Sequence, residues 1–289
     1  MNNDFRPRVG FIGAGRVGTT LGKYFHDHGA DVSGYYSKSH ESAQASATFT
    51  DTACYNSIAE LTSDCNMLFI TVPDGQIGSV WNEVSKYDIK GKCICHCSGA
   101  MSSSVFNDIT GHGASGYSIH PLCAVSSKEN SYRNFSNVFF SVEGSDKYRE
   151  SIISWLRAMG NPVSHIASDR KVLYHAAAVF ASNLGTALYN MASGILAECG
   201  IEADMATRAL SGLYLGNCMN VVDNGPVIAL TGPVDRNDIT TVNKHIEALA
   251  GDPLDIYKKL SLELIKVASV KNPDTDYSAL RRILSNATH

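Results

Sequence analysis

A lysine and a histidine stand one helical turn apart in a segment that is otherwise small and apolar. The segment DRKVLYHAAAVFASNLG, residues 169–185, predicts one continuous helix with Ser168 or Asp169 as its N-cap. At 3.6 residues per turn, Lys171 and His175 fall on the same helical face. A lysine whose pKa is lowered by burial and by a neighbouring histidine can donate a proton to a carbonyl oxygen as it becomes an alkoxide. The pair is therefore a candidate acid for a reaction at a carbonyl group.

Small residues continue the face on which this pair lies. The narrow stripe consists of Lys171, His175, Ala178, Ser182 and Gly185. Such a stripe leaves room for a ligand or for a closely approaching backbone. The alternative is a helix-packing groove in which the lysine is solvated and the histidine is satisfied by neighbours at the polar edge. Asn183 lies off the stripe, so it joins a site only if the helix bends or the ligand reaches around it.

A glycine motif near the N-terminus predicts a site for phosphate groups. RVGFIGAGRVGTTLGKYFHDHGADVSGYYSKS reads as strand, tight turn, helix, loop and second strand, the context that makes G-x-G-x-x-G specific. Gly13 would make the turn, Gly15 would let a pyrophosphate approach the backbone, and Gly18 would let the helix pack on the strand. The phosphates would lie at the helix N-terminus, beside the rest of the loop: Ala14, Arg16 and Val17. The alternative is a glycine-rich turn that binds nothing.

The end of the second strand predicts which dinucleotide binds. An NAD enzyme usually places an Asp or Glu there to hold the ribose hydroxyls. This chain has Ser37, Lys38 and Ser39 instead. Hydroxyl groups and a cation suit a 2′-phosphate, and Arg16 adds a second positive charge. We therefore expect NADP as the cofactor.

Polar residues follow three further apolar strands. NMLFITVPD ends in Val72, Pro73 and Asp74, KCICHCSGA ends in Ser98 and Gly99, and ASGYSIHPL ends in His120 and Pro121. Continuous apolar strands separated by helical stretches are typical of a parallel sheet covered on both faces. Ligands in such sheets bind at the carboxyl ends of the strands. Asp74, Ser98 and His120 are therefore candidate site residues, although turns at these places also use polar residues.

The second half of the chain predicts only helices. After NVFFSVEG, a helix near residues 147–159 and a short strand PVSHI, strand patterns stop, and Gly200, DNGP and GDP punctuate helical stretches. We expect a doubly wound Rossmann sheet of α/β class over residues 1–167. An all-helical domain for substrate binding and dimerisation would occupy residues 168–289.

The segment LTGPVDRND in this second half carries further ionic groups. Arg236 is a candidate clamp for a substrate carboxylate, with Asp238 orienting it and Thr231 donating a hydrogen bond. The alternative is a structured turn on Gly232 and Pro233, with Arg236 and Asp238 as an ordinary ion pair.

Composition excludes several classes of partner. The chain has 289 residues and a formal net charge of -4 at pH 7, without a long basic run, which argues against nucleic acid and anionic lipid. The N-terminus lacks the pattern of a signal peptide and no apolar run is long enough to span a bilayer, so we expect a cytoplasmic protein without membrane contact.

The eight cysteines do not form a disulfide framework, and in the cytoplasm they would be reduced. In CICHC, Cys93, Cys95 and Cys97 share one strand face and His96 points to the other, so we favour buried strand residues over a metal site.

These motifs together resemble the 6-phosphogluconate dehydrogenase-like superfamily over nearly the whole chain. GAGRVG, GYYSKS, VPD, HCSGA, IHPL, KVLYHAAAVFASN and ALTGPVDRND are most similar to a Rossmann-like branch with an uncharacterised C-terminal domain, some members of which are alternative ketopantoate reductases. In ketopantoate and β-hydroxyacid enzymes, a lysine on this helix donates the proton and an asparagine one turn later binds substrate. Lys171 matches the lysine. His175 stands where the asparagine is expected, and Asn183 is the candidate replacement.

The resemblance also implies other candidates and an oligomer. HCSG followed by IHP is similar to the serine and histidine of prephenate dehydrogenases, which keeps Ser98 and His120 as acid–base or orienting groups. It further implies a homodimer formed through the helical domain.

The expected activity is NADPH-dependent reduction of a small 2-oxo acid, with ketopantoate to pantoate as the expected reaction. The alternatives are a pyrroline-5-carboxylate reductase or another β-hydroxyacid dehydrogenase, and a protein that binds NADP as a signal without catalysis.

Overall fold

The computed structural model describes residues 5–286 of the chain and divides them into two compact units. The N-terminal unit extends to Phe180 and the C-terminal unit begins at Ala181. Each unit is described by itself.

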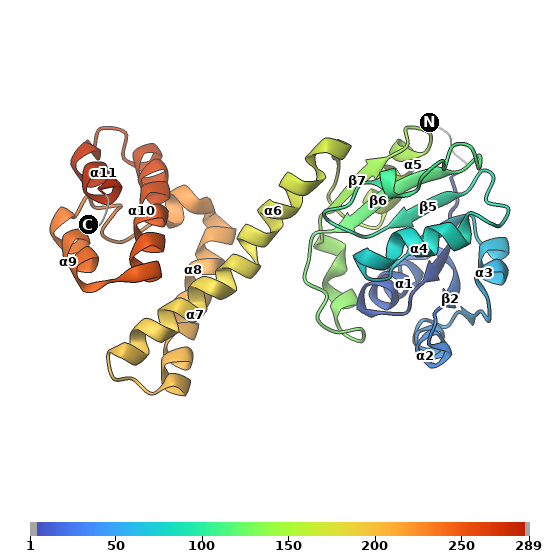
Figure 1. The fold of residues 1–289 in the computed structure, drawn as a ribbon, viewed down its shortest axis with the longest axis horizontal. Coiled ribbons are helices and arrows are strands. Elements are labelled where there is room, and N and C mark those ends of the chain that lie inside the picture. Colours follow the sequence, from blue (N-terminus) through green and yellow to red (C-terminus); the bar gives the residue numbers. More distant parts are fainter. Residues whose placement is uncertain (1–4, 287–289) are drawn as a thin grey trace. The chain divides into compact units, whose positions relative to one another are not determined.

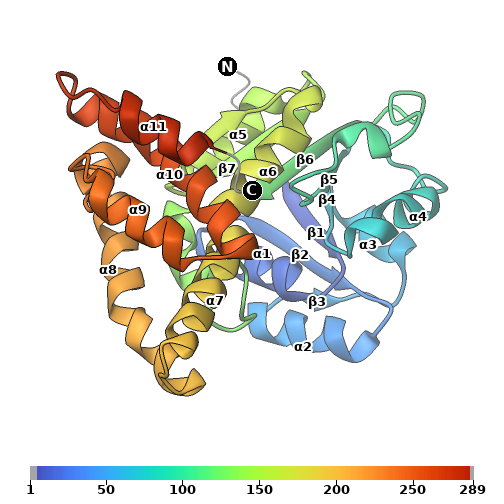
Figure 2. The same ribbon diagram turned by 60° about the vertical axis from the view of Figure 1, so that its left-hand side comes forward.

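An eight-stranded sheet forms the centre of the N-terminal unit. The strand order is β3-β2-β1-β4-β5-β6-β7-β8, which Figure 2 shows from β3 to β6. Every neighbouring pair is parallel except β6 with β7, which is antiparallel. The expected parallel sheet is therefore confirmed, and the sequence missed the reversal at β7 and the two-residue strand β3. The strands are β1 Arg8–Ile12, β2 Asp31–Tyr36, β3 Ala53–Cys54, β4 Met67–Ile70, β5 Cys93–His96, β6 Ser115–Pro121, β7 Phe140–Gly144 and β8 Val163–His165.

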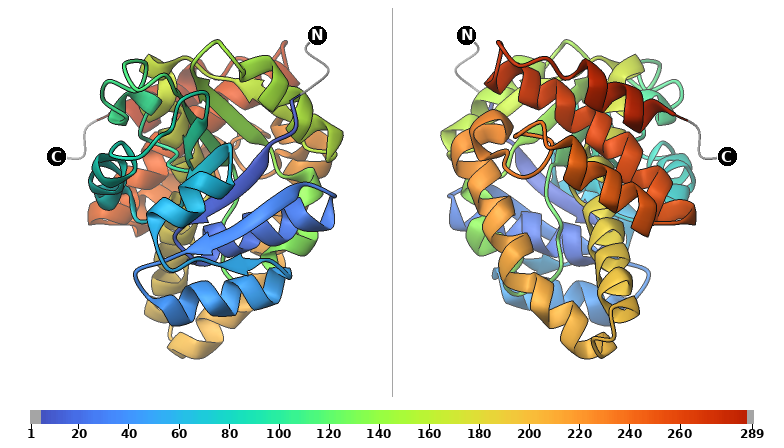
Figure 3. Two further views of the ribbon diagram at one scale, coloured as in Figure 1. Left: turned by 90° about the vertical axis from the view of Figure 1, so that its right-hand side faces the viewer. Right: turned by 90° about the vertical axis from the view of Figure 1, so that its left-hand side faces the viewer.

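Helices cover both faces of this sheet, because its central strands are apolar on both sides (Figure 1 and Figure 3, left). One buried cluster packs α1, α2 and α5 against the sheet through residues such as Leu21, Ala47 and Ile152. A second packs α3 and α4 through Leu61 and Trp81. These elements are α1 Arg16–Asp27, α2 His40–Thr50, α3 Ile58–Asp64, α4 Asp74–Val84, α5 Arg149–Ala158 and the 3₁₀ helices η1 Ser103–Val105, η2 Ser131–Asn137 and η3 Ser168–Arg170.

The helix expected over residues 169–185 is interrupted, which corrects the prediction. Residues 168–170 form η3, α6 spans Lys171–Ala181, and α7 begins at Asn183. Between them Ser182 leaves the helical region with φ -125° and ψ -79°. Neither Gly nor Pro marks this break, so the local sequence did not reveal it. The stripe of small residues consequently ends near Ala178, and Gly185 packs elsewhere, where an added Cβ would lie 2.6 Å from the Tyr214 hydroxyl.

Helices alone build the described part of the C-terminal unit. α7 and α8 pack side by side, as Figure 3 (right) shows. α9, α10 and α11 enclose a core that includes Val242, Ile265 and Leu280. The DNGP sequence kinks α8 at Gly225, which has a φ of 76°, instead of ending it. The bounds are α7 Asn183–Glu198, α8 Ala203–Ala229, α9 Ile239–Ala248, α10 Gly251–Lys271 and α11 Ser278–Ser285.

Within residues 5–286, no helix combines the length and the apolar character that a membrane crossing requires.

Candidate active site

The glycine turn after β1 has the geometry that its sequence predicts. Gly13 has a φ of 108°, and its N–H donates to the Tyr36 carbonyl at 2.8 Å, which ties the turn to the end of β2. An added Cβ at Gly18 would lie 2.3 Å from the Gly13 carbonyl oxygen, so this glycine permits the close packing of α1. An added Cβ at Gly15 would meet open space. The turn thus exposes the start of α1 to a ligand.

A cavity of about 480 Å³ lies beside this turn at the carboxyl ends of β1, β2 and β4. Seven of the predicted cofactor residues line it: Gly13, Ala14, Gly15, Ser37, Lys38, Val72 and Pro73. Ser39 is not among these lining residues. Its Oγ accepts from the N–H of Ser42 and so caps α2. The cofactor-binding roles of the lining residues, and those of Ser39, Arg16 and Val17, remain predictions.

Sequence reasoning missed several residues that shape this cavity. Thr71 donates through Oγ1 to the Gly13 carbonyl at 2.8 Å and so stiffens the turn. Lys128, from the segment after β6, donates to the Ala14 carbonyl at 2.8 Å. Tyr36, Ile58 and Gln76 contribute to the lining. No short motif marks these residues, since only the folded sheet brings them beside the glycines.

Asp74 and Ser98, predicted from separate strand ends, are in direct contact. Ser98 donates through Oγ to an Asp74 carboxylate oxygen at 2.6 Å and accepts from the Met101 N–H at 3.0 Å. Asp74 is the first residue of α4, and Ser98 follows β5. The bond therefore ties the rim of the cavity to the turn that carries Gly99.

Lys171 is buried at the start of α6, with 1 % of its surface exposed. Its ammonium donates to the Ser98 carbonyl at 3.0 Å and to the Ser118 hydroxyl at 2.8 Å. Burial lowers the pKa of Lys171 from 10.5 to about 8, and the Glu143 carboxylate opposes part of this shift. The side chain is therefore mostly cationic at neutral pH, and its pKa is close to the value that suits a general acid at that pH.

Two imidazoles meet over Gly99. An added Cβ there would lie 2.7 Å from Nδ1 of His175 and 3.0 Å from Nε2 of His120, so a side chain at this position would displace both rings. His120 is hydrogen bonded through Nδ1 to the Tyr174 hydroxyl at 2.9 Å. Burial, followed by the nearby charge of Lys171, lowers the pKa of His120 to about 3, so this ring is neutral at pH 7. The His175 Nδ1 atom is buried and has no hydrogen-bond partner within residues 5–286.

The N-terminal unit thus brings together six of the predicted residues, namely Lys171, His175, His120, Ser98, Gly99 and Asp74. Asn183 and Arg236 belong to the C-terminal unit, and their predicted roles remain predictions. Both carboxylate oxygens of Asp238 accept hydrogen bonds from Thr241, so this side chain caps α9. The ion pair suggested between Asp238 and Arg236 is not among the ion pairs of the described chain.

His96 in the CICHC sequence serves the turn after β5. Its Nδ1 accepts from the Ser98 N–H at 3.1 Å, and its Nε2 is hydrogen bonded to the Ser102 carbonyl at 3.2 Å. Burial lowers the pKa of His96 to about 4, so its ring is neutral at pH 7 and supports this turn through its two hydrogen bonds. In the part of the chain that the structure describes, no three His, Cys, Asp or Glu side chains are grouped as metal ligands would be.

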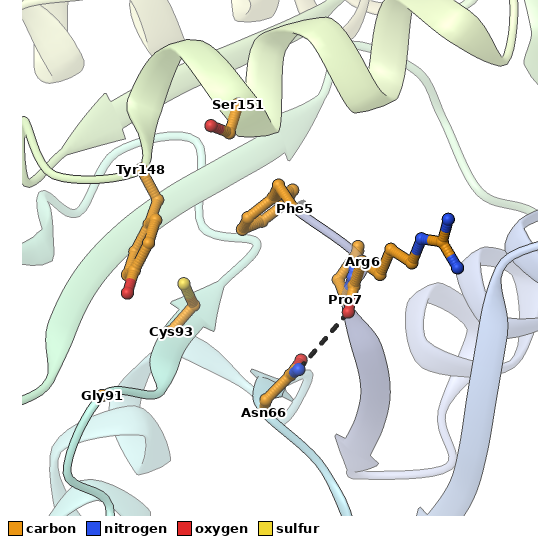
Figure 4. Close-up of a pocket in the computed structure, with 8 residues that line it drawn as sticks. All are labelled: Phe5, Arg6, Pro7, Asn66, Gly91, Cys93, Tyr148 and Ser151. Atoms are coloured by element: carbon orange, nitrogen blue, oxygen red, sulfur yellow. Dashed lines mark hydrogen bonds between the residues drawn. The ribbon is translucent and has the colours of Figure 1, made fainter. Parts of the chain in front are cut away.

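A second hollow, of about 200 Å³, lies at the opposite edge of the sheet (Figure 4). Its lining residues lie at the amino ends of β1, β4 and β5 or follow β7. Asn66 donates to the Arg6 carbonyl at 3.3 Å. The lining combines Phe5, Pro7, Cys93 and Tyr148, and among the described lining residues Arg6 has the one side chain that is charged at neutral pH. It lacks the acid and base groups of the carboxyl edge, so we assign the chemistry to the carboxyl edge.

Two family models match successive parts of the chain. The model described as a Rossmann-like domain matches residues 2–121, which include the glycine turn and β1 to β6. The N-terminal unit contains a Rossmann-like domain. A second model, described only as a domain of unknown function (DUF2520), matches residues 138–264. The expected pairing of a Rossmann-like domain with an uncharacterised C-terminal domain is thus confirmed, while the ketopantoate reductase branch remains a proposal. A search of curated proteins finds no match.

Solved structures share this fold over most of the chain. A Thermotoga maritima protein is 24 % identical, with a TM-score of 0.72, and the match covers 91 % of this chain and 99 % of that one. An imine reductase from Myxococcus stipitatus, in complex with NADP⁺, is 16 % identical at a TM-score of 0.59 and coverages of 96 % and 93 %. A Plasmodium falciparum pyrroline carboxylate reductase with NADP bound is 14 % identical at 0.59 and coverages of 94 % and 97 %. At these identities the likeness shows the fold alone.

The buried ammonium predicts how stability changes with pH. Between pH 8 and 10.5 an unfolded Lys171 keeps its proton while the folded one loses it, so the unfolded chain binds more protons and stability rises with pH. The Lys171→Met variant lacks this contribution. We expect the free energy of unfolding of the wild type, minus that of the variant, to rise by about 3 kcal/mol across this window.

Urea unfolding followed by tryptophan fluorescence measures this difference, because Trp81 and Trp155 both lie in the N-terminal unit. Lys90→Met, at an exposed position, is the control and should show no such rise. A difference that is constant with pH would contradict the burial of a charged Lys171.

Proposed function

We propose that the protein is an NADPH-dependent reductase of small 2-oxo acids, with ketopantoate as the preferred substrate. The observation that carries this proposal is the buried Lys171 ammonium, held by Ser98 and Ser118 at the same sheet edge as the glycine turn. Reduction of a carbonyl needs a hydride on carbon and a proton on oxygen. The cofactor supplies the hydride when bound, and the protein supplies the proton.

The residues around the glycine turn fit NADP. The start of α1 lacks a side-chain cap, so its N–H groups are available to a pyrophosphate at the open face of Gly15. Lys38 lines the cavity at the end of β2, where its ammonium would pair with a 2′-phosphate. Ser37 and Arg16 would add a hydroxyl and a second cation. Two solved structures of this fold contain NADP, which supports the same choice here.

Lys171 is the best candidate for the proton donor. At pH 7 it carries a proton that burial has made easier to release, whereas His120 is a neutral ring with a pKa of about 3. His120 therefore orients the substrate oxygen by hydrogen bonding and does not supply the proton as an imidazolium. His175 presents an unpartnered Nδ1 beside it and completes the binding surface over Gly99.

The charge of the site favours a carbonyl over an imine substrate. An ammonium and neutral imidazole N–H groups stabilise an oxygen that becomes negative, while the ammonium repels a protonated imine. Asp74 is the predicted site carboxylate, and it already accepts a hydrogen bond from Ser98. The positive charge of Lys171 therefore favours reduction of a 2-oxo acid over reduction of pyrroline-5-carboxylate.

Within the 2-oxo acid class, Arg236 would bind the substrate carboxylate. The product pantoate would enter pantothenate and CoA biosynthesis.

A homodimer is part of the proposal. Large apolar side chains are exposed along α8 of the C-terminal unit, including Leu213 at 73 %, Leu215 at 63 % and Val222 at 77 %. A second copy of the chain would cover such a surface. Sedimentation velocity tests the dimer.

We also propose a cytoplasmic location.

A substrate panel tests the activity. We expect the oxidation of NADPH, followed by its absorbance, to show kcat/KM for ketopantoate at least about tenfold above that for pyrroline-5-carboxylate, a ratio that corresponds to about 1.4 kcal/mol. Other 2-oxo acids serve as controls for size. Preference for the imine would contradict the charge argument. Tight NADPH binding without turnover of any compound would favour a protein that binds NADP as a signal.

Replacement of Lys38 tests the cofactor assignment. The Lys38→Ala variant loses one charge-assisted bond to the 2′-phosphate, so the Kd for NADPH should rise roughly tenfold or more. The Kd for NADH should change little, because NADH lacks that phosphate. Fluorescence titration of both cofactors measures this, with Lys90→Ala as the matched control. Equal changes for the two cofactors would remove the assignment of Lys38.

A further inference from the structure

A buried carboxylate lies beneath the candidate active site. Glu143 is on β7 and is 1 % exposed. One oxygen accepts from the Ser103 N–H at 2.7 Å, and the other accepts from the Ser103 hydroxyl at 2.9 Å and the Ser168 hydroxyl at 2.5 Å. Three hydrogen bonds compensate a charge that would otherwise be costly to bury. These donors come from two separate segments, η1 after β5 and η3 before α6.

The contacts of Glu143 lead directly to Lys171. Ser168 begins η3, which α6 follows at Lys171, so the carboxylate fixes where this helix begins. Glu143 also lies opposite Ser118 in the antiparallel register of β6 and β7. The Ser118 hydroxyl accepts from the Lys171 ammonium and donates to the Ser98 carbonyl at 3.1 Å. The hydrogen bonds of Glu143 and those of Lys171 therefore meet at the start of α6, and strand register places Glu143 opposite Ser118.

Groups from every neighbouring element face the Lys171 ammonium. From β7 comes Glu143, the largest of the charges that raise its pKa, and Asp74 on α4 acts in the same direction. Cys97 follows β5, but burial raises the pKa of its thiol to about 12, so it is neutral at pH 7. His120 on β6 and His96 on β5 are neutral at pH 7, while Tyr174 and His175 come from α6 itself. Asp74 is exposed to solvent, whereas Glu143 is not. Solvent screens the exposed carboxylate more strongly, so Glu143 supplies the main negative field.

We propose that Glu143 is a positioning residue that holds Lys171 in place as an ammonium, through its hydrogen bond to Ser168 and through its charge opposite Ser118 on the neighbouring strand. Its catalytic consequence rests on the function proposed above for Lys171, but its effect on the lysine charge does not. A carboxylate that served only to anchor two turns would leave the titration of Lys171 unchanged.

The direct test is the titration of Lys171 by NMR of protein with ¹³C-labelled lysine, in which Lys171→Met assigns the signal. Glu143→Gln preserves the shape of the side chain and removes its charge, so the pKa of Lys171 should fall by roughly one unit. Glu143→Asp keeps the charge and should restore most of the shift. Glu150→Gln, the same change at an exposed glutamate on α5, is the control and should leave the titration unchanged. An unchanged or raised pKa in Glu143→Gln would overturn the proposal.

A second variant decides the matter if Glu143→Gln does not fold. Ser103→Ala removes one hydroxyl donor from the carboxylate and leaves its charge less compensated, so the pKa of Lys171 should rise. No change or a fall in this variant would contradict the proposal.

Kinetics separate the two proposals. If the protein reduces 2-oxo acids, the alkaline limb of the kcat profile should move to lower pH in Glu143→Gln by the shift that NMR measures. A shifted NMR titration without turnover by the wild type would reject the reductase function and retain the role of Glu143. Turnover with an unshifted limb and an unshifted titration would reject the role of Glu143 alone.

Discussion

The site depends on the burial of one cation. A lysine with 1 % exposure can keep its charge only if the protein replaces the water around its ammonium, and each replacement constrains the fold. The carbonyl of Ser98 comes from the turn after β5, the hydroxyl of Ser118 from β6 and the charge of Glu143 from β7. Three adjacent strands must therefore lie in the observed order and register before α6 can bury its first residue.

The reversal of β7 is part of the same constraint. Because β7 is antiparallel to β6, Glu143 faces Ser118 and Ser141 faces His120 across the pair. Directly opposed residues have their side chains on the same face of a sheet, and residues two apart on a strand share that face as well. One face thus presents Ser118 to Lys171 and His120 to Tyr174. Lys171 and His120 are both held by the packing of α6 on one strand pair.

The sequence could predict those parts of the site that depend on residues close together in the chain. The glycine turn needs only adjacent residues, and so its motif predicted both the φ of Gly13 and the close packing at Gly18. Lys171 stood out because a lysine at the start of an apolar helix is unusual. Asp74, Ser98 and His120 followed from the rule that strand ends meet at one edge.

The remaining partners could not be predicted in the same way. Glu143 and Ser118 act through strand register, and neither lies in a recognisable motif. Thr71 and Lys128 reach the glycine turn from distant segments. The break at Ser182 lacks the Gly or Pro that usually marks a helix end, so the sequence predicts one continuous helix where the structure has two. Arg236 and Asn183 belong to the C-terminal unit.

The central claim is that Lys171 gives its proton to the carbonyl oxygen of a 2-oxo acid. The most direct measurement is the rate of a single turnover of ketopantoate with NADPH from neutral to alkaline pH. A donor must be protonated to act, so the rate should fall as pH rises through a value near 8. Lys171→Met should lose this dependence together with about 100-fold of the rate. A flat profile in the wild type, or a variant as fast as the wild type, would contradict the account.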